Sequence, residues 1–165
     1  TVRESGNVLT WLMNKTSRLH DMKIAEYYAT RGKLTNLDGR HGEHTALTYA
    51  SSEGHLDILK ALIAAGANKD KTDGSGYTPL LGAASRGRVE CVKALLAVKA
   101  DVNKASTCGA TPLIWGSRDG HVEILKLLLA AGAKKDKIDT YGDTALTLAT
   151  KRGHHEIVQL LQQAK

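Results

Sequence analysis

The sequence feature that most limits the possible folds is a period of 33 residues. At this interval the chain repeats a threonine, at Thr45, Thr78, Thr111 and Thr144. A leucine follows two residues after each threonine and a glycine follows nine residues after it. A repeat of this length is one supersecondary unit that cannot bury its apolar side alone, so neighbouring units have to stack into a continuous core. The chain is therefore expected to form an extended array of units.

Each unit carries the signals of two short helices. Thr111 suits an N-cap because its hydroxyl can accept a bond from a free backbone N–H, and Pro112 suits the first helical position, where no donor is needed. Gly120 suits the left-handed conformation that ends a helix. The residues after it have the spacing of a buried helical stripe, namely Val122, Ile124, Leu125, Leu128 and Leu129.

The stretch Gly109–Ala133 reads G-A-T-P-L-I-W-G-S-R-D-G-H-V-E-I-L-K-L-L-L-A-A-G-A, and this pattern at a period of 33 resembles the ankyrin repeat. The resemblance implies an all-α solenoid of helix–turn–helix units joined by β-hairpin loops. It implies one continuous domain with four repeats, at about 37–69, 70–102, 103–135 and 136–165. Residues 1–36 fit the pattern poorly and are predicted to be a degenerate capping repeat. A separate partner-binding arm is the alternative for this segment.

Two positions depart from the family pattern. The first is the position that carries histidine in ankyrin repeats, which here holds Thr48, Leu81, Ile114 and Thr147. The turn hydrogen bonds of that histidine are expected to be lost or weakened. The second is Lys99, which stands where Gly66 and Gly132 end their helices. A left-handed Lys99 would cost on the order of 1 kcal/mol.

The sequence contains no pattern of a catalytic or metal site, so no enzyme activity, cofactor or metal is predicted. It has no G-x-S-x-G, no H-E-x-x-H and no Gly-rich phosphate loop followed by Lys-Ser or Lys-Thr. His41 and His44 lack a third ligand at zinc spacing. Cys91 aligns with isoleucines of the other units and is predicted to lie in the core, whereas Cys108 is placed at a hairpin tip. We expect two free thiols, with a reactive or metal-binding Cys108 as the alternative.

The composition of the chain helps to predict its cellular compartment. The chain of 165 residues has no Phe, 4% aromatic residues and no apolar run near the ~18 residues of a membrane span. No N-terminal stretch has the plan of a secretory signal, although the first residue is Thr1 and targeting is left open. With free thiols, these features predict an intracellular protein in a reducing compartment. The cytoplasm is favoured, and the nucleus or an organelle is left open.

The resemblance implies that hairpin tips and first helices line a concave face that binds another protein. The candidates on this face fill no core position and vary between units. The predicted partner-binding residues are Tyr49, Ser52, Tyr77, Arg86, Trp115, Arg118, Asp119, Tyr141, Lys151 and Arg152. Trp115 is the leading contact, because Trp is enriched in interface hot spots. Its alternative is packing between first helices, with Gly116 beside it making room for the ring.

The primary interpretation is a non-catalytic protein–protein interaction scaffold, monomeric alone or a subunit of a complex. One alternative is a peripheral scaffold subunit of a large multi-protein assembly, an organellar assembly included. Another is weak electrostatic binding of anionic surfaces or nucleic acid, because the net charge is +6 and several basic residues cluster near the last hairpin. That cluster consists of Lys134, Lys135, Lys137, Lys151 and Arg152. Acidic residues interrupt it and few aromatics accompany it, so nucleic acid is disfavoured as a partner.

Overall fold

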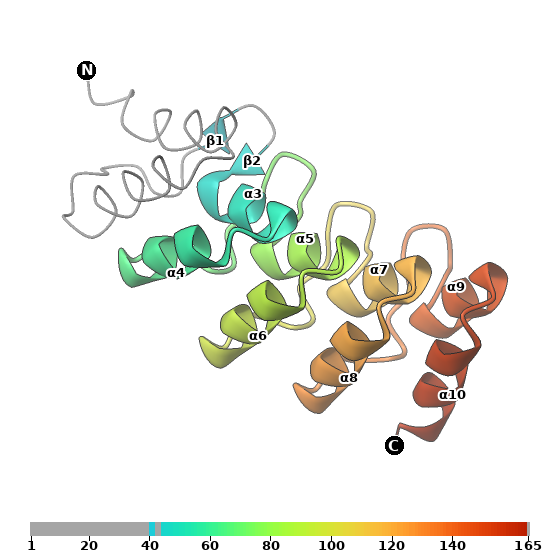
Figure 1. Ribbon diagram of the computed structural model, residues 1–165. Helices are drawn as coiled ribbons and strands as arrows, with labels where there is room; N and C mark the ends of the chain where they lie inside the picture. Colours follow the sequence, from blue (N-terminus) through green and yellow to red (C-terminus); the bar gives the residue numbers. More distant parts are fainter. Residues whose placement is uncertain (1–39, 42–43, 165) are drawn as a thin grey trace.

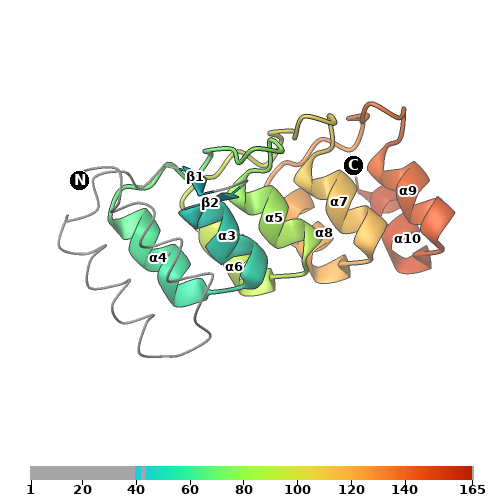
Figure 2. The same cartoon turned by 90° about the horizontal axis from the view of Figure 1, so that it is seen from above.

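The computed structural model describes residues 40–41 and 44–164 (Figure 1). The predicted N-terminal cap over residues 1–36 lies outside this range. Within the described residues the fold is an all-α array of helix pairs that stand side by side along one axis, in two layers (Figures 1 and 2). The first helices of the pairs are α3 (Ala46–Glu53), α5 (Pro79–Ser85), α7 (Pro112–Asp119) and α9 (Ala145–Arg152). The second helices are α4 (Leu56–Ala64), α6 (Val89–Ala97), α8 (Val122–Ala130) and α10 (His155–Gln163).

Threonine begins every first helix, as the sequence predicts. The hydroxyls of the four cap threonines accept the N–H three residues later at 3.1–3.4 Å. Thr48 and Thr147 return the bond, because their hydroxyls accept the backbone N–H of the cap residue at 2.9 and 2.8 Å. These two threonines thus supply a turn hydrogen bond where the sequence analysis expects a weakened turn. Leu81 and Ile114 at the same position are buried.

The core runs along the interface between the two layers. Leu47, Leu80 and Leu113 are at most 1% exposed, since each lies under the following unit. In α8 the predicted stripe is buried at Ile124, Leu125 and Leu128, and half-buried at the two remaining positions. Cys91 takes the place of an isoleucine in the core, as predicted.

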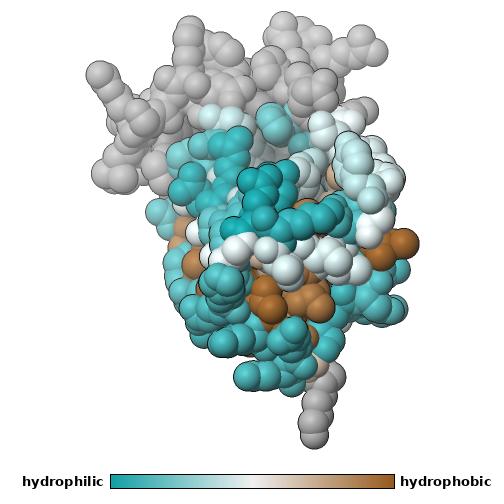
Figure 3. Space-filling model, turned by 90° about the vertical axis from the view of Figure 1, so that its right-hand side faces the viewer, coloured by the Kyte–Doolittle hydropathy of each residue, from teal (hydrophilic) through white to brown (hydrophobic). Residues whose placement is uncertain are grey.

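The end of the array formed by α9 and α10 differs from the interior. Leu146 is only half-buried and Thr150 is exposed, whereas their counterparts in the preceding units are buried. Gln162 is exposed, as its polar character predicts. Seen end-on, this side is mostly hydrophilic with a small hydrophobic group near its centre (Figure 3).

The loops between helix pairs contain less β-structure than the β-hairpins that the family resemblance implies. One antiparallel pair is present in the described residues, β1 (Arg40–His41) with β2 (His44–Thr45). Each later loop is closed by two backbone hydrogen bonds, as from the Asp73 N–H to the Tyr77 carbonyl at 3.0 Å and from the Gly76 N–H to the Asp73 carbonyl at 3.1 Å. Asp73 Oδ1 also accepts the N–H of Ser75 and Tyr77, which stabilises the turn. Asp139 Oδ1 does the same in the last loop, where it accepts the N–H of Tyr141 and Asp143.

Side chains at the start of the second helices tie each pair to the preceding one. The tie is a hydrogen bond from a ring or guanidinium nitrogen to a backbone carbonyl 36 residues earlier, at 3.0–3.2 Å. The bonded pairs are Arg88 with Ser52, His121 with Ser85 and His154 with Arg118. The two histidines thus have a structural role, since each joins neighbouring units.

Lys99 has φ 58°, in the left-handed region that the glycines at its equivalent positions occupy. Replacing Lys99 by glycine is expected to raise the free energy of unfolding by about 0.5–1 kcal/mol, because glycine adopts this conformation without strain. Urea denaturation of both proteins measures the change. A loss of stability would show that the Lys99 stem contributes packing that outweighs the strain.

Candidate partner-binding site

Two hollows lie on the face formed by the first helices and the loops that precede them, which we call the first-helix face. The larger, the polar groove, has a volume of about 430 Å³ and lies between α5, α7 and the loop before α5. Five of its lining residues are predicted partner contacts: Tyr77, Arg86, Trp115, Arg118 and Asp119. The others are His44, Asp73, Ser75 and Ser85.

Trp115 stands at the centre of this face and is half-buried. The Arg118 guanidinium carbon lies 3.7 Å from the centre of the indole ring, a cation–π contact. The Tyr77 ring lies on the loop side, with 5.6 Å between ring centroids. The indole Nε1 is buried and has no acceptor among the described residues. Trp115 is therefore neither fully packed nor fully exposed, and its ring is held in place by two neighbours.

Gly116 faces α8, in the layer of second helices. A methyl group there would lie 2.9 Å from Leu125 Cδ1 of α8. The missing side chain therefore allows α7 and α8 to approach each other.

The acidic groups of the polar groove are already paired. Arg118 binds Asp119 through two nitrogens, at 2.9 and 3.2 Å. Asp73 Oδ2 lies 3.1 Å from His44 Nδ1. Burial raises the pKa of Tyr77 above its ordinary value, and the neighbouring Cys108 adds to this effect while Arg118 opposes it. The Tyr77 hydroxyl thus stays protonated at neutral pH.

The smaller hollow, the apolar pocket, has a volume of about 130 Å³ and lies between α7 and α9. Its apolar lining consists of Cys108, Ala110, Ile114, Trp115, Tyr141 and Leu148. Arg118, Asp139 and Asp143 complete it. Trp115 and Arg118 line both hollows, so they form the wall that separates them.

The comparison with protein families agrees with this architecture. A family model described as ankyrin repeats (3 copies) matches residues 4–106 and 99–165. The chain belongs to the ankyrin repeat family. The comparison with curated proteins gives no match. Ankyrin repeats are generally non-catalytic protein–protein interaction modules.

Two further features of this ankyrin repeat protein concern metal binding and membrane spanning. No group of three or more His, Cys, Asp or Glu side chains in the described part of the chain could hold a metal ion. Within residues 44–164, no helix has the length and apolar character that crossing a membrane requires.

The other predicted contacts on the ankyrin first-helix face lie apart from the groove. Tyr141 lines the apolar pocket and is 84% exposed. Tyr49 lies between the rings of His44 and His55, with centroids 6.2 and 6.3 Å away. Ser52 packs against α5, where a methyl group on Gly82 would lie 2.4 Å from its Oγ.

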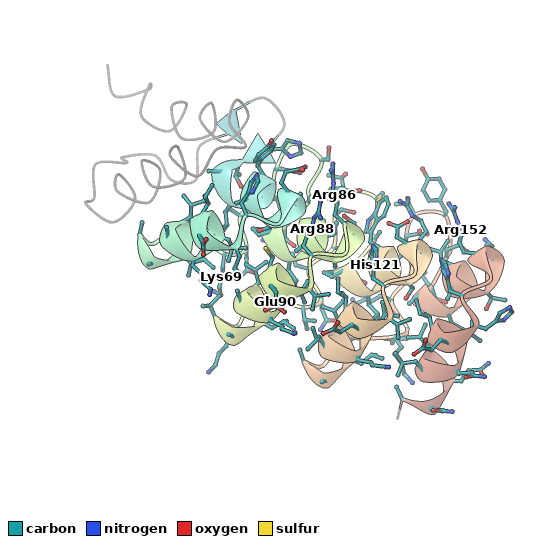
Figure 4. The ribbon with its side chains drawn as sticks, viewed as in Figure 1. Lys69, Arg86, Arg88, Glu90, His121 and Arg152 are labelled. Atoms are coloured by element: carbon teal, nitrogen blue, oxygen red, sulfur yellow. The ribbon has the colours of Figure 1, made fainter. Side chains whose placement is uncertain are left out.

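Lys151 and Arg152 are exposed near the end of α9 and line neither hollow. Lys151 Nζ pairs with Asp143 Oδ1 at 2.6 Å, and this hydrogen bond lowers the pKa of Asp143. In Figure 4, Arg86 and Arg152 lie on the side of the first helices, whereas Glu90 lies on α6 in the second layer. The predicted set is therefore split, with the centre of the face at Trp115.

Asp73 is one of the lining residues that are not among the predicted partner contacts. Its side chain is buried where two ankyrin units meet. The available signal was its 33-residue spacing from Ser106 and Asp139, together with His44 in the hairpin before it.

The two cysteines differ in accessibility. Both are free thiols, as the sequence analysis expects; Cys91 is 1% exposed, and Cys108 is partly exposed, with its Sγ 3.1 Å from Ser106 Oγ. Iodoacetamide is expected to alkylate Cys108 in the folded protein and Cys91 only after unfolding. Burial excludes the reagent from Cys91 and raises the pKa of its thiol, which lowers the thiolate fraction. Mass spectrometry of peptides after timed alkylation, with and without urea, measures both rates. Equal rates in the folded state would contradict the packing of Cys91.

Proposed function

We propose that the chain is a non-catalytic scaffold that binds another protein across the first-helix face, with Trp115 at the centre of the contact. The observation that supports this most is the stacked pair of Trp115 and Arg118, which lines both hollows on that face. Trp, Tyr and Arg are the residues most enriched in interface hot spots, and all three types meet here. The ring is held by Tyr77 and Arg118, so little side-chain entropy is lost on binding.

The same proposal includes the division of the chain into a capping repeat over 1–36 and four repeats over 37–165, and a reducing intracellular compartment. The helix pairs between Ala46 and Gln163 support the four repeats, and the two free thiols support the reducing compartment.

Binding of anionic surfaces or nucleic acid has less support. In the basic cluster, Lys135 Nζ bonds the backbone carbonyls of Leu161 and Ala164 at the end of α10. Lys151 is paired with Asp143. Two of the cluster's cations are thus already engaged, and the array of free cations that a polyanion needs is reduced.

A charge reversal at Arg118 tests the proposed face. Arg118→Glu is expected to abolish capture of the partner from an extract of the native source, because it removes the cation stacked on Trp115 and places an acid beside Asp119. The matched control is Lys126→Glu in α8, which makes the same charge change in the second layer and breaks only an exposed pair with Glu156. Equal capture of the partner by both variants would show that the interface does not include Arg118 on the first-helix face.

A further inference from the structure

We propose that the apolar pocket between α7 and α9 binds one basic side chain of the partner, a lysine or an arginine. The charged head of that side chain bonds Oδ2 of Asp139, and its aliphatic stem packs against the apolar lining. This inference rests on the proposed function and adds to it the chemistry of one partner side chain.

The loop before α5 contains a hydrogen bond that the loop before α9 lacks. Asp73 and Asp139 stand at equivalent positions, and Oδ1 of each accepts two backbone N–H groups of its own loop. Oδ2 of Asp73 also accepts a bond from Nδ1 of His44, at 3.1 Å. The residue that stands to Asp139 as His44 stands to Asp73, 29 residues earlier, is Ala110. Alanine has no side-chain donor, so Oδ2 of Asp139 has no partner within the described part of the chain.

The same alanine leaves room for a side chain from outside. Ala110 and Asp139 both line the apolar pocket, whose volume is about 130 Å³. A cavity of about 150 Å³ holds a benzene ring, so the stem of one lysine or arginine fits. These stems pack on apolar surface, which Ile114 and Leu148 provide here. The exposed ring of Tyr141, on the same pocket, is also a favourable neighbour for a cation.

The other charged groups of the pocket are already paired. Arg118 bonds Asp119 through two nitrogens, and Asp143 is paired with Lys151. Asp139 is therefore the lining carboxylate that forms no ion pair within the part of the chain that the structure describes. The net charge of +6 repels a basic partner at long range. Salt screens that repulsion beyond about 8 Å at physiological ionic strength, whereas a partly buried pair in the pocket is screened much less.

The test begins with selection of random 12-residue peptides, displayed on phage, on the full native chain after depletion on Asp139→Asn. Asparagine keeps one oxygen for the loop N–H groups and replaces Oδ2 by an amide nitrogen, which cannot accept a bond. Enriched peptides are expected to carry lysine or arginine. The matched control is Asp136→Asn, which removes the same charge from an exposed residue of the same loop that lines neither hollow. The control should bind the enriched peptides within about twofold of the native chain.

Synthetic peptides then test the charged head. The basic residue is replaced by a neutral side chain of similar shape, norleucine for lysine or citrulline for arginine. On the native chain this change is expected to lower affinity at least about tenfold, because a charge-assisted hydrogen bond is lost. On Asp139→Asn the same change should have an effect below about twofold. The comparison on the native chain needs no variant of the protein, so it stays decisive if Asp139→Asn folds poorly.

Two further measurements place the peptide in the pocket. Ala110→His supplies an internal imidazole in the position that His44 has relative to Asp73, and it is expected to weaken peptide binding at least about tenfold. The bound peptide is expected to slow alkylation of Cys108 by iodoacetamide, because this thiol lines the pocket. Alkylation of Cys91, measured in the same samples, should not change.

The outcomes separate this inference from the proposed function. Enrichment of no peptide, enriched sequences without lysine or arginine, or unchanged alkylation of Cys108 would overturn the inference. Equal affinity of the neutral peptide would overturn it too, and would show that the pocket takes an apolar side chain. If peptides selected without depletion lose binding in Trp115→Ala but not in Asp139→Asn, the inference fails and the proposed face stands. If they bind both variants as tightly as the native chain, the proposed face itself is wrong.

Discussion

Replacing Gly120 by alanine is expected to lower the free energy of unfolding by roughly 2–4 kcal/mol. Gly120 has φ 84°, where a side chain costs about 1–2 kcal/mol. A methyl group there would also lie 2.9 Å from Cε1 of His154. That ring cannot move away freely, because its Nε2 is bonded to the Arg118 carbonyl at 3.1 Å. The substitution therefore combines backbone strain with the loss of a tie between neighbouring repeats.

Gly153 offers a matched control for this experiment. It ends α9 with φ 74°, and nothing lies within 4 Å of the position that a methyl group would take. Gly153→Ala is expected to cost only the backbone term of about 1–2 kcal/mol. Urea denaturation of the two variants and the native chain gives both values. Equal losses of stability would mean that the close contact between Gly120 and the His154 ring contributes nothing to the free energy of unfolding.

The second large effect is expected for Trp115→Ala. The half-buried ring should cost about 1–3 kcal/mol of stability when removed, less than the 3–5 kcal/mol typical of a fully buried Trp. Partner affinity should fall by about 2 kcal/mol or more, since the residue lines both hollows. Denaturation followed by circular dichroism measures the first quantity, and titration with the captured partner measures the second.

Arg118→Ala and the double variant complete a mutant cycle for this pair. The coupling between the guanidinium and the indole should be about 0.5–2 kcal/mol if the cation–π contact stabilises the free protein. Unchanged partner affinity in Trp115→Ala would exclude the first-helix face, and the second helices or residues 1–36 would become the region to investigate.

The repeat fold could be predicted from the sequence because its signals are local. Thr111 caps a helix through a bond to an N–H three residues away, and Gly120 ends that helix through its own φ angle. The left-handed conformation of Lys99 could also be predicted, because Gly66 and Gly132 stand at the equivalent positions of other units. Burial of Cys91 needs only the 33-residue alignment, since equivalent positions of stacked units have equivalent surroundings.

The candidate site could be predicted only as a surface. An alignment of units gives the helix face of Trp115 but not the rotamer that brings it against Tyr77 and Arg118. The bond between His44 and Asp73 depends on the path of two neighbouring loops, which no single unit encodes. Contacts of this kind join side chains of different repeats, so they depend on how the units stack. The division of the face into a polar and an apolar hollow was for this reason not visible in the sequence.

The polar groove exists only where neighbouring units are docked, because its walls come from three of them, with His44 in the first and Trp115 in the third. Partner binding and docking of those units are consequently linked equilibria: a ligand held by neighbouring units adds its binding free energy to their interface. Conversely, any variant that opens the interface reduces the apparent affinity by the fraction of molecules still closed, even when every contacting side chain is intact. Substitutions in the ties at His121 and Arg88, far from the ligand, would then behave as affinity variants.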